Sequence, residues 1–367
     1  MAGGFKGVSP WDKDIKSYES KITRINIEKQ QQLYHKRKLP NNIFQKVLWK
    51  LSLIFWEIKK NKLKGNYNDP SLGYEAKFYN KAKEIIQKEK STIVIVSTGP
   101  FTYAELIPKL KADFPEVKFV IDYRDYWEDV FVWLNKAQIE TEVKTQQNIL
   151  NGINLVLSPN NEMQNYYSKK FSKPSYLLPH CIDADDIFEI SQNKNSGKIK
   201  LLYGGAFYDD IGENIELIKE YTDKLKQHDP VDVEFYVSVK GYEKELAHPN
   251  IKRFDFIGSQ DYFKKVLEAD YVILILPPNR VNAMSSKFYE LVAFRKPILY
   301  FGNEGDVSNF IIKNKLGFHI TKDNVEAQVK ASIQNTKDLL VPDLNYNISK
   351  HTFEYQTKEL IKELEKL

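Results

Sequence analysis

The sequence predicts an α/β protein with two Rossmann-like, doubly wound domains. In each half of the 367-residue chain, short apolar runs that suit buried strands alternate with longer segments of helical periodicity. This alternation favours a parallel sheet with helices on both faces, because right-handed crossovers carry the chain from strand to strand. The length also suits two domains, and a polar stretch at 191–197 separates the two halves.

The N-terminal half contains strand and helix patterns from about residue 91 onward. We expect strands at 93–96, 117–121, 155–157 and 176–178, and helices at 101–111, 137–150 and 162–171. Residues 1–18 show no convincing buried strand, and 22–27 is the first strand-like run.

The C-terminal half repeats the pattern. We expect strands at 199–203, 233–239, 251–257, 271–276, 298–301 and 318–320, and helices at 211–227, 261–269, from about 286, and at 307–315. A charged amphipathic helix closes the chain at 352–367. We therefore divide the chain into an N-terminal domain (1–188), a linker (189–198), a C-terminal domain (199–348) and a terminal segment (349–367).

Composition excludes several classes of protein. The single cysteine, Cys181, forms no intramolecular disulfide, which is typical of a reducing compartment. No run of 18 apolar residues predicts a membrane-spanning helix, and the N-terminus lacks the apolar core of a secretory signal. We therefore expect a cytoplasmic protein, or one attached peripherally to the cytoplasmic face of a membrane.

Positive charge is concentrated in one segment. The net charge is +5, but residues 31–65 contain nine Lys or Arg and one acid, Glu57. Within this segment, 43–64 combines a broad apolar helical face with six lysines. Such a helix suits an anionic membrane surface. A core helix with a solvated basic end is an equal alternative, and no fold signature supports nucleic-acid binding.

The most informative motif is a Lys and a Glu three residues apart. Lys287 and Glu290 lie at the start of a predicted helix that follows the strand at 271–276. In an open α/β sheet, ligands bind outside the carboxyl ends of the strands. A Lys there can hold a phosphate, and a Glu one turn later can accept hydrogen bonds from two adjacent ribose hydroxyls. The pair indicates a nucleotide-sugar site, and the alternative is a surface charge pair.

The run 285–300 resembles the donor-site motif of GT-B glycosyltransferases of the glycogen synthase-like superfamily. In that motif a Ser or Pro, a Lys, two hydrophobic residues and a Glu precede a small-residue turn and Pro-Ile, so Ser286, Lys287 and Glu290 match by position. The resemblance covers 91–367 well. It implies two domains facing across a cleft, a nucleotide-diphosphate sugar as co-substrate without a cofactor or metal, and a last helix that crosses back to the first domain. The family's first strand and Gly-rich loop are not evident, so this unit is expected to be missing or shortened.

The resemblance also assigns other donor-side residues. Gly204 and Gly205, after the strand at 199–203, would let the chain approach the donor diphosphate closely. Gly258 lies where the nucleotide base meets backbone groups in this family. Asn282 stands where retaining members carry the first of two Glu residues, which leaves the sugar and the stereochemical outcome open.

The segment 122–129 carries the candidate catalytic residues. It resembles the Asp-x-Arg-Asp-x-Trp segment of GT-B enzymes that build cell-surface polysaccharides. The resemblance implies that Asp125 acts as general base on an acceptor hydroxyl or orients it, and that Arg124 holds a phosphate or positions Asp125. The alternative is an Asp–Arg ion pair that caps the next helix.

A second strand end carries candidate acceptor-side residues. Ser97, Thr98 and Gly99 follow the strand at 93–96 and open a predicted helix. Exposed N–H groups there would face an anionic or hydroxyl group of the acceptor. The alternative is a turn that needs Gly and Pro for its geometry.

Together these features predict a glycosyltransferase that moves a sugar from a nucleotide-diphosphate sugar to a hydroxyl of a glycan or lipid-linked glycan in cell-surface polysaccharide biosynthesis. The six histidines show no metal-ligand spacing, and no Asp-x-Asp pair follows a core strand, so no metal is expected. A non-catalytic GT-B-like subunit that binds a partner or a membrane is the main alternative, and a sugar epimerase of the same fold is a third. The sequence specifies neither the donor sugar, the base, the acceptor nor the oligomeric state.

Overall fold

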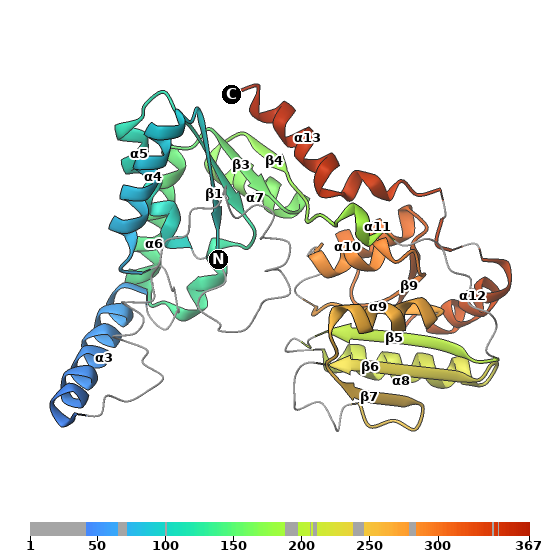
Figure 1. Cartoon of the computed structure of the whole chain (residues 1–367). Helices are drawn as coiled ribbons and strands as arrows, with labels where there is room; N and C mark the ends of the chain where they lie inside the picture. The colour runs from blue at the N-terminus through green and yellow to red at the C-terminus, as the bar shows by residue number, and fades with distance from the viewer. Residues whose placement is uncertain are drawn as a thin grey trace. The chain divides into compact units, whose positions relative to one another are not determined.

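Two compact units make up the part of the chain that the structure describes. The computed structural model describes residues 42–64, 72–99, 101–187, 197–205, 207, 211–237, 246–278, 284–339, 341–343 and 345–367. The units divide between Leu177 and Leu178, and each is built around a parallel sheet (Figure 1). The predicted α/β class with two Rossmann-like domains is confirmed. The strand-like run at 22–27 and nearly all of the predicted linker lie outside the described residues. The predicted cleft and the return of the last helix stay predictions.

The first unit has a four-stranded sheet in the order β1-β2-β3-β4, and all neighbouring strands are parallel. The strands are β1 (Ile93–Thr98), β2 (Lys118–Tyr123), β3 (Leu155–Ser158) and β4 (Ser175–Leu177). The helical elements are α3 (Ile43–Lys64), α4 (Glu75–Glu89), the 3-10 helix η2 (Phe101–Leu106), α5 (Ile107–Asp113), the 3-10 helix η3 (Trp127–Trp133), α6 (Lys136–Asn151) and α7 (Asn161–Phe171).

Aromatic packing fixes the turn that follows β2. Tyr123, the last residue of β2, stacks on Tyr167 of α7 with ring centroids 4.2 Å apart. Phe101 stacks on Trp127 at 5.0 Å, and all four rings are buried. Stacked aromatic pairs add roughly 0.5–1.5 kcal/mol beyond their area burial. These contacts hold both ends of the turn that carries residues 124–125.

The second unit has a six-stranded parallel sheet in the order β10-β9-β8-β5-β6-β7. From β5 the chain adds β6 and β7 on one side, and then β8, β9 and β10 on the other. This reversal creates a topological switch point beyond the carboxyl ends of β5 and β8, where doubly wound sheets bind ligands. The strands are β5 (Ile199–Gly205), β6 (Val231–Val237), β7 (Ile251–Asp255), β8 (Tyr271–Ile275), β9 (Ile298–Phe301) and β10 (Gly317–Ile320).

Helices cover both faces of this second sheet. Ile218 of α8 and Val329 of α12 share one core with Leu201 of β5. On the other face, Phe288 of α10 shares a core with Leu202. Successive strand residues thus pack on opposite faces, as a buried strand requires. The helical elements are η4 (Ala184–Asp186), α8 (Gly212–Lys226), α9 (Ser259–Glu268), α10 (Ser286–Ala293), α11 (Asp306–Lys313), α12 (Val325–Asp338), η5 (Ile348–His351) and α13 (Phe353–Leu364).

Several elements differ from the sequence-based expectation. The segment 101–111 begins as a 3-10 helix and becomes α-helical only at α5, and β5 continues through both glycines at 204–205. Two helices, α4 and α12, were not predicted. Their apolar repeats are weak, since α4 buries only Ile86, and the buried side of α12 includes Ser332 and Asn335.

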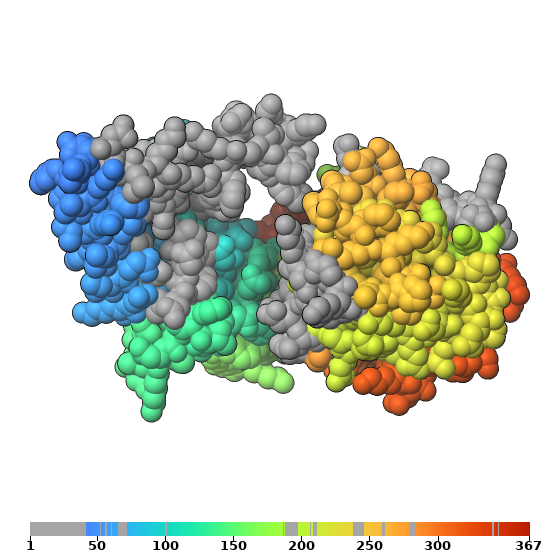
Figure 2. Space-filling model, turned by 90° about the horizontal axis from the view of Figure 1, so that it is seen from below, coloured from blue at the N-terminus to red at the C-terminus, as the bar shows by residue number. Residues whose placement is uncertain are grey.

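α3 does not pack as a core helix. Its apolar residues from Ile43 to Ile58 are mostly exposed, and its surface, blue in Figure 2, lies at the edge of the first unit. The alternative of a core helix is therefore wrong for this segment.

An ion-pair cluster attaches the C-terminal end of α3. The Nζ of Lys64 lies 2.7 Å from Oε1 of Glu142 and 3.0 Å from Oε1 of Glu105. The other oxygen of Glu142 accepts a hydrogen bond from Nε1 of Trp127 at 2.9 Å. Burial lowers the pKa of Lys64, but the two carboxylates raise it more, so that it lies above its ordinary value. The cluster thus connects α3 to η2, α6 and the turn after β2.

Lys64→Met should destabilise the first unit, because it leaves the buried Glu142 carboxylate without its cation. We expect the free energy of unfolding to fall by about 3–5 kcal/mol, measured by urea denaturation. Lys62→Met, which removes an exposed lysine of the same helix, should change it by less than about 0.5 kcal/mol. Equal changes in the free energy of unfolding for the two substitutions would contradict the role of the Lys64 ion-pair cluster in attaching α3.

Candidate functional site

The start of α10 presents the predicted donor residues of the second unit. Ser285 caps this helix, since its Oγ accepts a backbone N–H hydrogen bond at 3.3 Å. Ser286 is the first helical residue and is exposed, as is Glu290 one turn later. Lys287 is partly buried. Asn282, from the loop before the helix, lies outside the described residues.

Lys287 reaches from α10 to the end of β5. Its Nζ lies 4.0 Å from the centroid of the Tyr203 ring, which is a cation–π contact. A Cβ at Gly205 would lie 2.6 Å from the same Nζ, and the φ of Gly205 is +147°. A side chain at 205 would therefore meet the ammonium and would strain the backbone. The predicted residues Lys287 and Gly205 lie together at the switch point.

Gly204 is a glycine for another reason. A Cβ there would lie 2.2 Å from the ring of Tyr262, which comes from α9. Tyr262 therefore packs directly over the backbone at the end of β5. By contrast, Gly258 precedes α9 in an exposed position where a Cβ would meet nothing within 4 Å, so no packing constraint selects glycine there.

The surroundings of Lys287 favour a bound anion. Burial lowers the pKa of Lys287 to about 8, and the negative charge of Glu290 raises it by a smaller amount. Within the residues that the structure describes, Lys287 forms no ion pair. A desolvated ammonium without a carboxylate partner is costly to keep charged, and an incoming phosphate would relieve that cost.

Glu290 lies near both Lys287 and the Tyr262 hydroxyl. Its charge raises the pKa of Lys287, and burial together with this charge raises the pKa of Tyr262. An exposed carboxylate one turn from a phosphate-binding lysine suits recognition of ribose hydroxyls, because it accepts hydrogen bonds from two neighbouring groups.

In the first unit, Asp122 joins the carboxyl ends of β1 and β2. Ser97 and Asp122 are partners in the parallel register. Ser97 Oγ and Arg124 Nε each donate a hydrogen bond to Asp122 Oδ2, both at 2.9 Å. Thr98 Oγ1 donates to the main-chain oxygen of Asp122 at 3.1 Å. Three of the predicted residues thus meet around an aspartate that sequence analysis had not selected.

Asp122 has an unused acceptor oxygen. Its side chain is buried, and Oδ1 accepts no hydrogen bond from the residues that the structure describes. A buried carboxylate oxygen without a donor costs free energy. The sequence signal was an acidic residue near the end of an otherwise apolar strand.

Asp125 lies next to Gly99 at the same edge. It is exposed, and its Oδ2 is 3.9 Å from the position of a Cβ at Gly99, whose φ is +109°. Arg124 pairs with Asp122, so the alternative of an Asp–Arg ion pair is correct in part. The pair does not cap η3, however, because the N-cap residue of η3 is Tyr126 and makes no side-chain cap.

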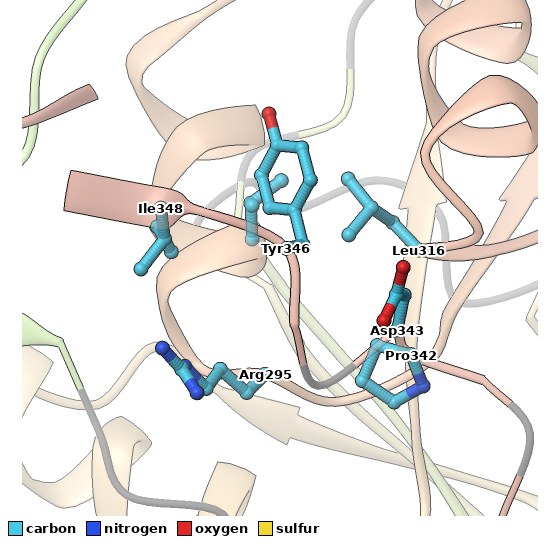
Figure 3. Close-up of a pocket in the computed structure, with 7 residues that line it drawn as sticks. Arg295, Leu316, Pro342, Asp343, Tyr346 and Ile348 are labelled. Carbon is cyan, nitrogen blue, oxygen red and sulfur yellow. The ribbon is translucent and has the colours of Figure 1, made fainter. Parts of the chain in front are cut away.

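A small pocket in the second unit lies behind α10, away from Lys287. Figure 3 shows it between the end of α10 and the segment before η5, with the guanidinium of Arg295 and the carboxylate of Asp343 apart from one another. Its volume of about 10 Å³ holds roughly one water molecule. It is therefore too small for a nucleotide.

The residues that the structure describes contain no group of three or more His, Cys, Asp or Glu side chains arranged to hold a metal ion. None of their helices combines the length and apolar character needed to cross a bilayer.

Solved structures share the fold at low sequence identity. A sucrose-phosphate synthase from Thermosynechococcus elongatus superposes with a TM-score of 0.57 and 11% identity, over 83% of this chain and 81% of that chain. A glycosyltransferase from Rickettsia africae superposes with a TM-score of 0.57 and 15% identity, over 84% and 86%. The N-terminal domain of a Candida albicans trehalose-6-phosphate phosphatase gives 0.52 and 12%, over 97% and 87%. No protein-family model matches the chain, and no curated protein matches it in sequence. The similarities show that the chain has the fold of the GT-B glycosyltransferases.

Gly205→Ala should destabilise the second unit and displace Lys287. The new Cβ would collide with the ammonium, and the positive φ would be strained, so we expect the melting temperature to fall, with a loss of about 1–3 kcal/mol. Gly212→Ala, at the start of α8, is the matched control, since its Cβ would meet nothing within 4 Å. A Gly205→Ala protein as stable as the Gly212→Ala protein would contradict the described position of Lys287.

Proposed function

We propose that the protein is a glycosyltransferase that transfers a sugar from a nucleotide-diphosphate sugar to a hydroxyl of a glycan or lipid-linked glycan. The observation that carries the proposal is Lys287, a partly buried ammonium that forms no ion pair with the described residues, at the switch point of a GT-B-type sheet. A second observation supports it. The carboxyl edge of the other sheet gathers Ser97, Asp122, Arg124 and Asp125.

On the donor side, the ammonium of Lys287 would bind the diphosphate. The glycine backbone at 204–205 would allow close approach, and Glu290 would accept hydrogen bonds from the ribose hydroxyls. As the bond from the sugar to the diphosphate breaks, negative charge grows on the leaving group. Lys287 and the N-terminal end of α10 would stabilise that charge.

On the acceptor side, an acidic group would take the proton of the acceptor hydroxyl. The acceptor oxygen attacks the anomeric carbon, the carbon–oxygen bond to the diphosphate breaks, and the acceptor proton passes to the base. Asp125 is exposed and suits the role of general base. Asp122, which accepts hydrogen bonds from Ser97 and Arg124, would hold these two side chains beside the acceptor.

Two structural neighbours are consistent with this proposal. One is a sucrose-phosphate synthase and one is a glycosyltransferase, and both superpose on more than four fifths of the chain. The proposal includes hexosyl transfer by a metal-independent reaction. It also includes a role in cell-surface polysaccharide biosynthesis on the cytoplasmic side of a membrane. These parts of the proposal rest on the sequence resemblance.

The two alternatives predict different ligands and products. A non-catalytic subunit would release no nucleoside diphosphate, and an epimerase would convert a nucleotide sugar without an acceptor. The group of Ser97, Asp122, Arg124 and Asp125 favours a transferase, because a second set of polar side chains at a strand edge suits a second substrate.

Donor binding is tested by thermal-shift screening of the full chain against UDP-, GDP-, ADP- and CMP-sugars. A ligand that binds only the folded state raises the melting temperature. For the donor that binds, Lys287→Met should weaken affinity by at least about tenfold, since a charge-assisted phosphate contact is worth about 1.5–3 kcal/mol. The matched control, Lys264→Met, removes an exposed lysine of α9 and should leave affinity unchanged. If no nucleotide sugar binds, or if both variants behave alike, the proposal is wrong.

Donor affinity should also depend on pH through Lys287. Its pKa in the free protein is about 8, and the bound phosphate would require the charged form, so binding takes up a proton above pH 8. We expect affinity to fall about tenfold between pH 7 and 9 in calorimetric titrations. The Lys287→Met protein should bind the donor weakly, and its donor affinity should not depend on pH. If the donor affinity of the unmodified protein is also constant between pH 7 and 9, no titrating Lys287 contacts the donor.

A further inference from the structure

The most prominent surface feature outside the candidate site is an apolar stripe on α3. Eight apolar side chains of this helix are between 50% and 78% exposed. At 3.6 residues per turn they fall within an arc of about 140°, so they form one continuous stripe. The stripe consists of Ile43, Phe44, Val47, Leu48, Leu51, Ile54, Phe55 and Ile58.

Lysines accompany this stripe. α3 carries six lysines and one acid, Glu57. Lys50 and Lys59 are exposed on opposite borders of the arc, and Lys62 is exposed beyond its C-terminal end. An exposed apolar stripe with cationic borders is the arrangement of helices that lie in the interface of anionic membranes.

The attachment of α3 determines where the stripe lies on the first unit. Gln138, in the first turn of α6, donates hydrogen bonds to the main-chain oxygens of Asn61 and Lys62, and Glu142, one turn later, binds Lys64. The C-terminal end of α3 therefore lies beside the first turns of α6, and the N-terminal part of α3 extends beyond the start of α6. Residues 43–60 extend roughly 27 Å beyond this contact, as the projecting helix in Figure 1 shows.

The start of α6 marks the carboxyl edge of the sheet, because α6 follows β2 through η3. The same edge carries the cluster of Ser97, Asp122 and Arg124. The projecting stripe and the candidate acceptor site therefore lie toward the same end of the first unit.

We propose that the exposed stripe of α3 docks on the surface of an anionic phospholipid membrane. The apolar side chains would enter the interface, and the lysines would bind the acidic headgroups. Docking would hold the Asp122 edge toward the membrane, where a lipid-linked acceptor is presented. The docking itself does not depend on the proposed transferase activity, whereas this use of it does.

Charge argues against the other occupants of the stripe. A second copy of the chain would bring Lys50, Lys59 and Lys62 of its own α3 against the same three exposed lysines. Residues 1–41 of the same chain carry nine Lys or Arg and only four Asp or Glu, so their charge does not complement these lysines either. Anionic lipid is the occupant with complementary charge.

Vesicle flotation of the full chain tests the proposal without any nucleotide. We expect binding to vesicles of phosphatidylcholine with phosphatidylglycerol, weak binding to pure phosphatidylcholine, and release by high salt, which screens the lysines. Leu51→Glu/Ile54→Glu should lower the partition coefficient by at least about tenfold. Ile312→Glu/Ile361→Glu is the matched control, because it adds the same charge at similarly exposed residues of α11 and α13 and should bind as the unmodified protein does.

Three results would overturn the inference. The first is no binding to anionic vesicles at low salt, and the second is an equal loss of binding in both double variants. The third is a concentration-dependent dimer in sedimentation that Leu51→Glu/Ile54→Glu abolishes, which would make the stripe an interface between copies. Donor binding and diphosphate release are measured without vesicles, so a failure of docking is distinguishable from a failure of the proposed function.

Discussion

One constrained lysine determines how the end of β5 is packed. Lys287 comes from the start of α10 but lies against the end of β5, with its ammonium over the Tyr203 ring and in the space that a side chain at 205 would occupy. The glycine is required because the lysine is there, and the lysine reaches this point because β5 and β8 are neighbours in the sheet. Burial lowers its pKa, so the folded protein holds a cation that a bound anion would stabilise.

The first unit also places charged groups at the carboxyl ends of parallel strands, but its central group is the negatively charged Asp122. Its parallel register brings Ser97 beside Asp122, and Arg124 completes the hydrogen bonding of one carboxylate oxygen, while the other is buried and accepts no hydrogen bond from the described residues. In both units the polar groups gather where strands end, because the strands themselves are buried on both faces and tolerate few polar side chains. In the proposed function, the ammonium on one sheet would bind the donor diphosphate, and the polar groups on the other would face the acceptor.

Much of this arrangement was predictable from sequence. Long apolar runs identified the strands, and the positions of Lys287, Glu290 and the double glycine followed from the strand–loop–helix order. The contacts that give these residues their properties were not predictable, because Tyr203, Tyr262 and Asp122 act through neighbours far away in the sequence. Asp122 matters only because the register pairs it with Ser97, and register is a tertiary property. The helices α4 and α12 were missed because they bury few apolar side chains. The exposure of α3 also required a structure, since an apolar helical face predicts burial and membrane contact equally well.

The central claim is that the ammonium of Lys287 binds the diphosphate of a nucleotide. NMR of the protein with isotopically methylated lysines measures this directly, with Lys287→Met used to assign the signal. We expect Lys287 to titrate near pH 8 in the free protein, and a bound nucleoside diphosphate (UDP, GDP or ADP) to raise its pKa above the ordinary value for lysine. A pKa at the ordinary value in the free protein, or one that none of these nucleotides changes, would contradict it.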